Sequence, residues 1–262
     1  MQNLERAAQR IAAARLAGEP LGLLPEGERP PDEAAAYRVQ DRLHAILTEA
    51  GRGPVTGHKI GCTTPVMQRY LGIPNPCAGG VFARAVHRSP ALLAHDEFIR
   101  VGVECEIAVR IARDLDHMDA PFTADRMAHA IDACMAAVEI VDDRYADWRR
   151  TDAPTLIADD FFAAGCVLGE SVARGRWPAL ADAVGTTRVN GREVGQGRGA
   201  DVMGHPFRAL AWLANMLAAR GRGLRRGEFV LTGSLVETRW LAPGDRVSVE
   251  VAGLGSVSAE FA

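Results

Sequence analysis

The sequence has little lysine, no cysteine pairs of the metal-binding kind and no long apolar run. Of its 30 basic residues, 29 are arginine and only one, Lys59, is lysine. The five cysteines include no C-x-x-C pair and are odd in number, which argues against a zinc site and against a disulfide framework. No stretch of about 18 apolar residues predicts a membrane span, and the net charge of -3 indicates neither a nucleic-acid nor a membrane partner. These absences favour a protein of the reducing cytoplasm.

The single lysine is a candidate for chemistry. Arginine keeps its proton at any usable pH, whereas a partly buried lysine can release one and presents its charge as a compact point. Lys59 lies in a strand predicted over residues 55–64, between Gly57 and Gly61, where a backbone and a ligand can approach closely. The alternative is a surface lysine without a role.

Two carboxylates stand within the apolar run VGVECEIAVRI, residues 101–111. Successive side chains of a strand point to opposite faces, so Glu104 and Glu106 would share one face. Like charges in a half-buried segment repel each other and lose hydration, and a divalent cation between them would relieve both costs. A solvent-facing edge strand is the alternative explanation of this spacing.

A third acid, Glu139, stands in another apolar stretch, residues 138–141, which is short enough to be a buried strand. Three carboxylates from two strands would leave the other positions of an octahedral Mg²⁺ or Mn²⁺ ion to water and substrate. The alternative is a salt bridge in the core between Glu139 and an arginine such as Arg144.

The predicted elements are a few helices and many short strands. Without a regular strand–helix–strand rhythm, they favour an α+β fold centred on a mixed, rolled sheet. We expect residues 1–54 to form a small helical N-terminal region and residues 55–262 to form the sheet-rich domain. Helices are expected over residues 4–16, 32–50, 124–136 and 206–220, with a hairpin turn at 190–191.

Several segments resemble, in order and spacing, the 2-keto-4-pentenoate hydratase and 4-oxalocrotonate decarboxylase family, a branch of the fumarylacetoacetate hydrolase superfamily. They are GHKIGCTT, VGVECEIAV, AAVEIVDDRYADW, IADD, GQGRGADVMGHP and FVLTGSL. The resemblance covers nearly the whole chain from about residue 32. It implies a mixed β-roll, barrel-like catalytic core with a helical N-terminal part, and a Mg²⁺ or Mn²⁺ ion held by Glu104, Glu106 and Glu139.

The resemblance also implies roles for residues outside the carboxylate cluster. Lys59 is expected to bind the substrate and move its protons, with Asp159 as its candidate partner. Arg144 belongs to a segment that forms the substrate site. The chain departs from the family where members commonly carry D-N-A-S, because it has Asp-Asp-Phe-Phe from residue 159. Phe162 cannot hydrogen-bond a substrate carboxylate as serine would, and Asp160 would add negative charge there.

The activity that the resemblance implies is hydration of a 2-hydroxy-2,4-dienoic acid to a 4-hydroxy-2-oxo acid in the catabolism of aromatic compounds. Three further readings stay open: a 4-oxalocrotonate-type decarboxylase, a C–C hydrolase with a His–Glu pair that activates water, and an inactive paralogue that binds a dicarboxylic acid. The expected partners are the small acid substrate, further copies of the chain in a homo-oligomer, and a pathway partner enzyme. Neither nucleic acid nor membrane is expected.

Overall fold

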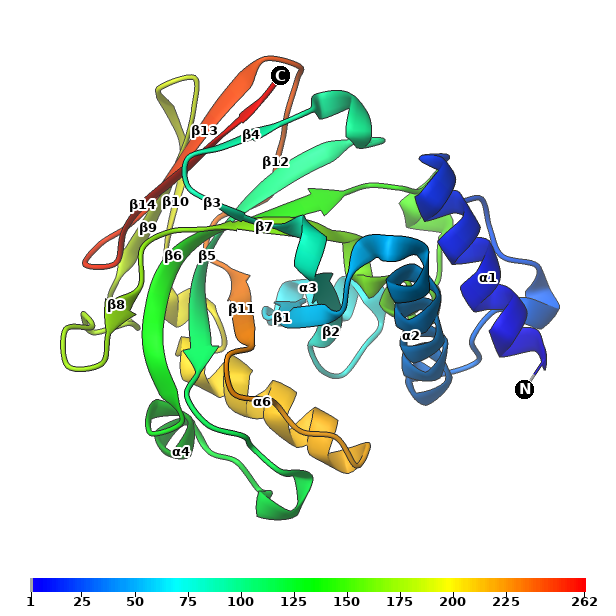
Figure 1. Ribbon diagram of the computed structural model, residues 1–262, viewed down its shortest axis with the longest axis horizontal. Coiled ribbons are helices and arrows are strands. Elements are labelled where there is room, and N and C mark those ends of the chain that lie inside the picture. Colours follow the sequence, from blue (N-terminus) through cyan, green and yellow to red (C-terminus); the bar gives the residue numbers. More distant parts are fainter. Residues whose placement is uncertain (1) are drawn as a thin grey trace.

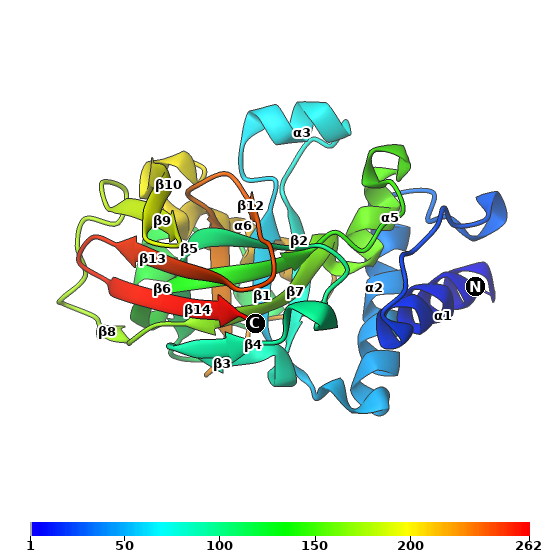
Figure 2. The ribbon, with the colours of Figure 1, turned by 90° about the horizontal axis from the view of Figure 1, so that it is seen from above.

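The structure is a computed structural model that describes residues 2–262. A nine-stranded sheet and a five-stranded sheet form its centre, and helices lie at one end and beside the larger sheet (Figure 1). The helices are α1 Gln2–Ala17, α2 Glu33–Leu47, α3 Pro65–Leu71, α4 Ala124–Ala128, α5 Ala153–Ala158 and α6 Pro206–Ala219. Figure 2 shows α3 projecting away from the sheets, with α1, α2 and α5 gathered at one end.

The larger sheet runs in the order β2-β1-β11-β5-β6-β7-β3, with β12 beside β5 and β8 beside β6. Its pairs are antiparallel except for β1–β11 and β3–β7. Its strands are β1 Val55–Gly61, β2 Cys77–Phe82, β3 Val86–Arg88, β5 Val101–Ile111, β6 Ile131–Asp142, β7 Ala163–Leu168, β8 Val172–Ala173, β11 Phe229–Ser234 and β12 Arg239–Trp240. The strand predicted over residues 101–111 is confirmed, and its place between β11 and β6 excludes an edge strand.

The smaller sheet has the order β10-β9-β13-β14-β4. It contains β4 Ala91–Leu93, β9 Val184–Val189, β10 Arg192–Arg198, β13 Asp245–Val251 and β14 Gly255–Phe261. The predicted hairpin joins β9 to β10, where Asn190 and Gly191 both have positive φ, as this two-residue turn requires. The mixed, rolled α+β fold is confirmed, but neither sheet closes into a barrel within residues 2–262.

The helix predicted over residues 124–136 is wrong beyond its first turns. Thr123 caps α4 as expected, but α4 ends at Ala128 and β6 begins at Ile131. Alanine and methionine in this segment favour helix locally. The segment nevertheless pairs with β5 on one side and with β7 and β8 on the other, and it is buried almost throughout. Sheet pairing therefore overrides the local preference.

The N-terminal helices α1 and α2 pack against each other, and α2 also packs against α5. Helix α1 ends at the residue before Gly18, whose φ is positive, and Asp32 caps α2 by accepting a hydrogen bond from the Ala35 amide at 2.7 Å. One hydrophobic core includes Ile11 and Leu43 from these helices together with Val138 and Phe261 from the sheets. The predicted division at residue 54 stays a prediction, although the core runs across it.

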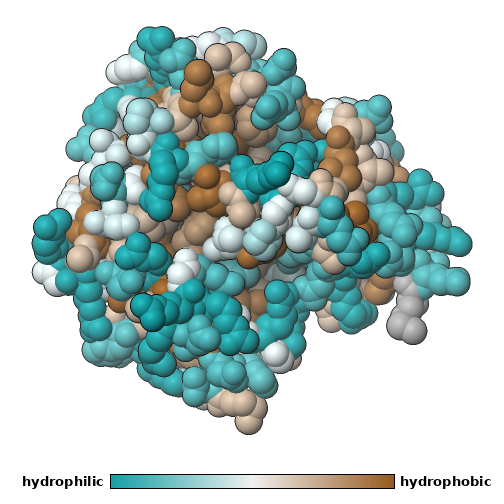
Figure 3. Space-filling model, in the orientation of Figure 1, coloured by the Kyte–Doolittle hydropathy of each residue, from teal (hydrophilic) through white to brown (hydrophobic). Residues whose placement is uncertain are grey.

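No helix among the described residues is long and apolar enough to cross a membrane. The face of the molecule in Figure 3 carries mostly hydrophilic residues with apolar residues between them. The hydrophobic side chains are concentrated instead in the core between the sheets and under the helices.

Gly79 offers a test of how closely β2 approaches the segment after α5. It pairs with Lys59 in the sheet, and a Cβ atom at this position would lie 2.5 Å from the carbonyl oxygen of Asp160. We expect Gly79→Ala to lower the free energy of unfolding by about 1–3 kcal/mol in urea denaturation, because the backbone must shift to admit the methyl group. Gly22→Ala, where a Cβ would meet nothing within 4 Å, is the control. Equal stability of both variants would contradict the close approach.

Candidate metal centre and active site

Antiparallel pairing of β5 with β6 assembles the three carboxylates. Glu104 is the direct cross-strand partner of Glu139, and Glu106 lies two residues further along the same face of β5. One carboxylate oxygen from each residue lies within 4.8 Å of the other two. Glu106 and Glu139 are fully buried, whereas Glu104 is partly buried and faces a cavity. The structure thus brings together the three predicted metal ligands.

This cluster carries more negative charge than its surroundings neutralise. Burial and the neighbouring Glu139 carboxylate raise the pKa of Glu104 to about 6, and the same two causes raise the pKa of Glu106 well above its usual range. The Gly233 amide donates a hydrogen bond to Glu106 Oε2 at 2.8 Å, and the Thr238 hydroxyl donates one to Glu104. A cation among these acids would remove the repulsion.

Two carboxylate oxygens in the cluster have no partner among residues 2–262. They are Glu106 Oε1 and Glu139 Oε2, both of which are buried. An unpaired buried carboxylate oxygen is costly unless a cation binds it. Carboxylate oxygens are also the ligands that Mg²⁺ and Mn²⁺ prefer. The residues present therefore fit a divalent metal ion.

The single lysine lies beside this cluster. Strand β1 is held between β2 and β11, and it carries Lys59 into the interior with its Nζ atom 2.9 Å from Glu139 Oε1. Burial alone would lower the pKa of Lys59, but the carboxylates of Glu139 and Glu104 outweigh burial and raise it. Lys59 is 3% exposed, which excludes a surface lysine without a role. Glu139 pairs with this lysine rather than with Arg144.

A cavity of about 430 Å³ opens beside Glu104 and Lys59. Hydroxyl groups of Thr63, Ser234 and Thr238 line the cavity together with these two charged residues. Apolar side chains form much of the remaining surface, namely Ile60, Met67, Val141, Trp148, Phe161, Phe162, Leu235, Val236 and Trp240. Phe162 lines this cavity, and its predicted substrate-binding role stays a prediction, whereas Arg144, Asp159 and Asp160 do not line the cavity.

The Arg144 side chain forms hydrogen bonds with the turn behind the cavity. Its guanidinium donates hydrogen bonds to the carboxylate and carbonyl groups of Asp159 at 3.2 and 3.0 Å, and to the carbonyl groups of Phe162 and Ala163 at 3.3 and 3.0 Å. Asp159 also accepts a hydrogen bond from the Tyr145 hydroxyl at 3.0 Å. The predicted substrate-binding role of Arg144 and catalytic role of Asp159 stay predictions, since these contacts fix the turn rather than face the cavity.

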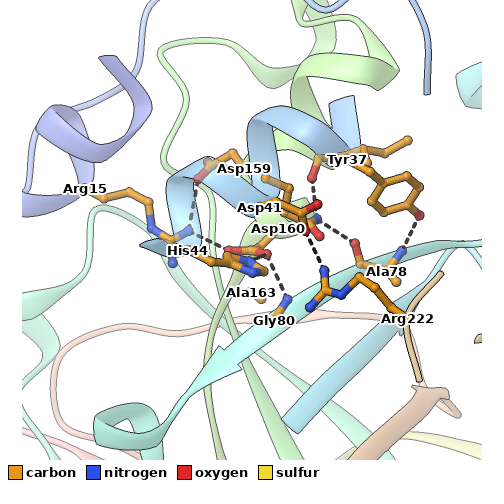
Figure 4. A network of polar contacts seen from close by, with 12 residues as sticks. Arg15, Tyr37, Asp41, His44, Ala78, Gly80, Asp159, Asp160, Ala163 and Arg222 are labelled. Carbon is orange, nitrogen blue, oxygen red and sulfur yellow. Dashed lines mark hydrogen bonds and ion pairs between the residues drawn. The ribbon is translucent and has the colours of Figure 1, made fainter. Parts of the chain in front are cut away.

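Asp160 points away from the cavity into the N-terminal helices (Figure 4). Its carboxylate lies 2.9 Å from Arg15 Nη1 of α1 and 2.6 Å from His44 Nε2 of α2, and it accepts a hydrogen bond from the Gly80 amide at 2.8 Å. Burial alone would raise the pKa of Asp160, but His44, Arg15 and the amide hold it well below its usual range. Asp160 therefore pairs with the helices and does not line the cavity, and its predicted substrate-binding role stays a prediction.

Arg15 and His44 belong to the surroundings of the site, and sequence reasoning did not find them. They lie 145 and 116 positions from Asp160 along the chain. Each stands in an ordinary amphipathic helix pattern, and no spacing rule connects such a residue to a distant turn. The signal in the sequence is a pair of acids that stands between apolar residues, which indicates buried carboxylates in need of partners but does not say which residues they are.

Comparison with known proteins agrees with the fold. A family model described as fumarylacetoacetate (FAA) hydrolase C-terminal matches residues 82–262. The chain is 38% identical to the TodF product hydratase of Pseudomonas putida, over 88% of this chain and 85% of that protein. It is 34% identical to 2-keto-4-pentenoate hydratase 2 of Dechloromonas aromatica, over 98% of this chain and 97% of that protein.

A solved structure extends the likeness to the whole fold. The 4-oxalocrotonate decarboxylase of Pseudomonas putida G7, complexed with magnesium and adipate, superposes with a TM-score of 0.92 at 28% identity, covering 100% of this chain and 98% of the other. The chain therefore belongs to the fumarylacetoacetate hydrolase superfamily, in the branch of the 2-keto-4-pentenoate hydratases and 4-oxalocrotonate decarboxylases. The resemblance drawn from the sequence is confirmed.

The carboxylate cluster predicts a defined response to loss of one acid. We expect Glu106→Gln to weaken Mg²⁺ binding by at least about 100-fold in calorimetry, since even residues that only orient metal ligands contribute 10- to 100-fold. The metal-free variant should not lose stability in urea, because the substitution removes repulsion. Glu237→Gln is the control, as its side chain is 85% exposed at the cavity edge. Unchanged Mg²⁺ affinity of Glu106→Gln would show that the triad is not the metal site.

The environment of Asp160 makes stability depend on pH in a known direction. Its pKa is lower in the folded chain than the usual 3.8, so its contribution is complete above that pH and is lost as the pH falls. At neutral pH we expect Asp160→Asn to lower the free energy of unfolding by about 1–3 kcal/mol, because Arg15, His44 and the Gly80 amide lose a buried charged acceptor. The difference from the unmodified protein should shrink between about pH 4 and pH 2. The exposed Asp182, as Asp182→Asn, should show neither effect.

Proposed function

We propose that this protein is a divalent-metal-dependent hydratase. It adds water to a 2-hydroxy-2,4-dienoic acid to give a 4-hydroxy-2-oxo acid in the breakdown of aromatic compounds. The observation that carries the proposal is the buried triad of Glu104, Glu106 and Glu139 beside Lys59, at a cavity of a size suited to a small acid. The proposal is also supported by similarity, over most of the chain, to proteins that are named as hydratases.

The three glutamates would hold Mg²⁺ or Mn²⁺ at the inner end of the cavity. The ion would attract the carboxylate and 2-oxo oxygens of the acid and stabilise negative charge that develops on the latter. The protein's own contribution is a fixed arrangement of ligands. Because Glu104 and Glu139 are paired across two central strands, their oxygens stay in place before the substrate arrives.

Lys59 would take part in proton transfer at the same end of the cavity. Hydration needs one proton to leave the 2-hydroxyl group and one to reach C5, after which water supplies a hydroxyl group to C4 and a proton to C3. Glu139 holds the Lys59 ammonium group charged, so Lys59 would orient the substrate as a cation, and it would relay to C5 the proton that leaves the 2-hydroxyl group. Asp159 would act through Arg144 as a positioning residue, since both hold the turn behind the cavity.

Decarboxylation of a 4-oxalocrotonate-type acid is the second candidate. It is favoured by the similarity to the decarboxylase of Pseudomonas putida G7, whose complex contains magnesium and a dicarboxylate. It would use the same glutamates, because loss of carbon dioxide also places negative charge on the 2-oxo oxygen. The choice between the two reactions therefore depends on the part of the cavity that contacts the remainder of the substrate.

A C–C hydrolase and an inactive dicarboxylate-binding paralogue have less support in the structure. His58 does pair with Glu228, at 3.7 Å between Nε2 and Oε2, but it is adjacent to Lys59 on β1 and therefore points to the opposite face of the sheet. No His–Glu pair lines the cavity among the described residues, which disfavours the hydrolase. Intact metal ligands and a buried lysine disfavour the inactive paralogue.

We also propose that the chain works in the cytoplasm and as a homo-oligomer. The five cysteines are free thiols, as expected in a reducing compartment. Two large apolar side chains of α3, Val66 and Tyr70, are 65% and 59% exposed on a projecting helix, and contact with a second copy would cover them. A complex with a pathway partner enzyme stays an expectation from the family resemblance.

The proposed reaction is tested by the absorbance of the dienoic acid. With Mg²⁺ or Mn²⁺ present, we expect the ultraviolet absorbance of 2-hydroxypenta-2,4-dienoate to fall as its double bonds are consumed, and a chelator to stop the reaction. Lys59→Arg keeps the charge but not the proton transfer, so kcat should fall by roughly 10²- to 10⁴-fold. Full activity of that variant would remove Lys59 from proton transfer, and an absence of reaction with every dienoate and either metal would refute the hydratase proposal.

A further inference from the structure

Aromatic side chains lead from the lysine towards the surface of the protein. The Phe161 ring lies 5.5 Å from Lys59 Nζ, Phe162 lies 5.3 Å from Phe161, and Trp148 lies 6.0 Å from Phe162. We call these three rings the aromatic wall, and all of them line the cavity. Tyr70, which is 59% exposed, continues the row 5.8 Å beyond Trp148. The wall therefore connects the inner, charged end of the cavity with the solvent.

The cavity offers little to a second negative charge. Lys59 is the only cation among the described residues that line it, and this cation already pairs with Glu139. The other charged lining residues are acids, namely Glu104, Asp201 and Glu237. A carboxylate at the far end of a substrate would lose hydration beside aromatic rings without gaining a cationic partner. An alkyl group in the same place would bury apolar surface, which is favourable.

Two arginines near the wall do not change this balance. The donors of Arg144 are directed to Asp159 and to the carbonyl groups of the turn, and the residue does not line the cavity. Arg149 lies with its guanidinium 5.3 Å from the Trp148 ring, but it is exposed and borders a neighbouring depression instead. Arg149 is therefore a cation near the wall that a long diacid could reach.

The wall is held in a strained but rigid conformation. Asp160, Phe161 and Phe162 have φ values of 57°, 47° and 67°, a region that bulky residues rarely adopt. Arg144 binds the backbone from behind, and the Asp160 carboxylate is fixed by Arg15 and the other partners seen in Figure 4. Backbone strain of this kind persists only when the surroundings impose it, and it is concentrated at functional sites.

We propose that the aromatic wall makes the site selective for acids with an apolar tail over diacids of the same length, and that Phe162 is a specificity-determining residue. This inference rests on the proposed function in one respect, which is that the 2-oxo acid end of the ligand lies at Glu104 and Lys59. The tail then extends along Phe161 and Phe162 towards Trp148. Phe162 is the central ring of the wall, in contact with both of the others.

The test uses two unreactive acids with six carbons each. Binding of 2-oxohexanoate and of 2-oxoadipate to the Mg²⁺-loaded protein is measured by calorimetry, and we expect the monoacid to bind roughly 10- to 100-fold more tightly. Phe162→Ser should reduce this preference severalfold, whereas Phe162→Leu should largely keep it because an apolar side chain remains. The comparison of the two acids on the unmodified protein needs no variant, so a folding defect in Phe162→Ser cannot obscure the result.

Two outcomes would overturn the inference. One is that the unmodified protein binds 2-oxoadipate as tightly as 2-oxohexanoate, or more tightly. If Arg149→Ala then lost this affinity for 2-oxoadipate, Arg149 would be the cation that binds the second carboxylate. The other is an unchanged preference in a folded Phe162→Ser variant, which would exclude this residue as its source. Both outcomes can be distinguished from failure of the proposed function. In that case no dienoate would be hydrated, but the protein would still bind 2-oxohexanoate more tightly than 2-oxoadipate. Hydration of dienoates without any tail preference would overturn the inference alone.

Discussion

Three carboxylates and one ammonium group are buried together on one face of the central sheet, and the remaining structure is arranged around this imbalance of charge. The long β5–β6 pair fixes the acids, while β1, held between two other strands, brings the lysine to them. A chain that buries like charges folds at a cost that a bound cation can offset. Metal binding and folding are therefore thermodynamically linked in this protein, so metal supply affects its stability as well as its activity.

The parts of this centre that follow from local pattern could be predicted from the sequence. Alternation in residues 101–111 places Glu104 and Glu106 on one face whatever the partner strand, and the scarcity of lysine marks Lys59. The start of β6 could not be predicted, because its helix-favouring residues become a strand only through pairing with β5, β7 and β8. The surroundings of Asp160 could not be predicted either, since its partners come from helices far away in the chain.

The turn at residues 160–162 separates two roles that the sequence alone could not distinguish. An acid followed by two phenylalanines suggested a charge and a ring at the same site. The structure instead directs Asp160 into the helices and both rings towards the cavity. This separation depends on three successive residues with positive φ. Support from Arg144 and from the helices is thus the condition under which bulky side chains occupy this turn.

The contacts of Arg15 and His44 with Asp160 also affect how this enzyme can evolve. The family model begins at residue 82, and Lys59 and both of these helix residues lie before it. If the sheet domain were joined to different N-terminal helices, Asp160 would keep its partners only where those helices supplied equivalent side chains at the positions of Arg15 and His44. A substitution at Asp160 therefore acts on α1 and α2 as well as on the turn that carries the cavity-lining rings.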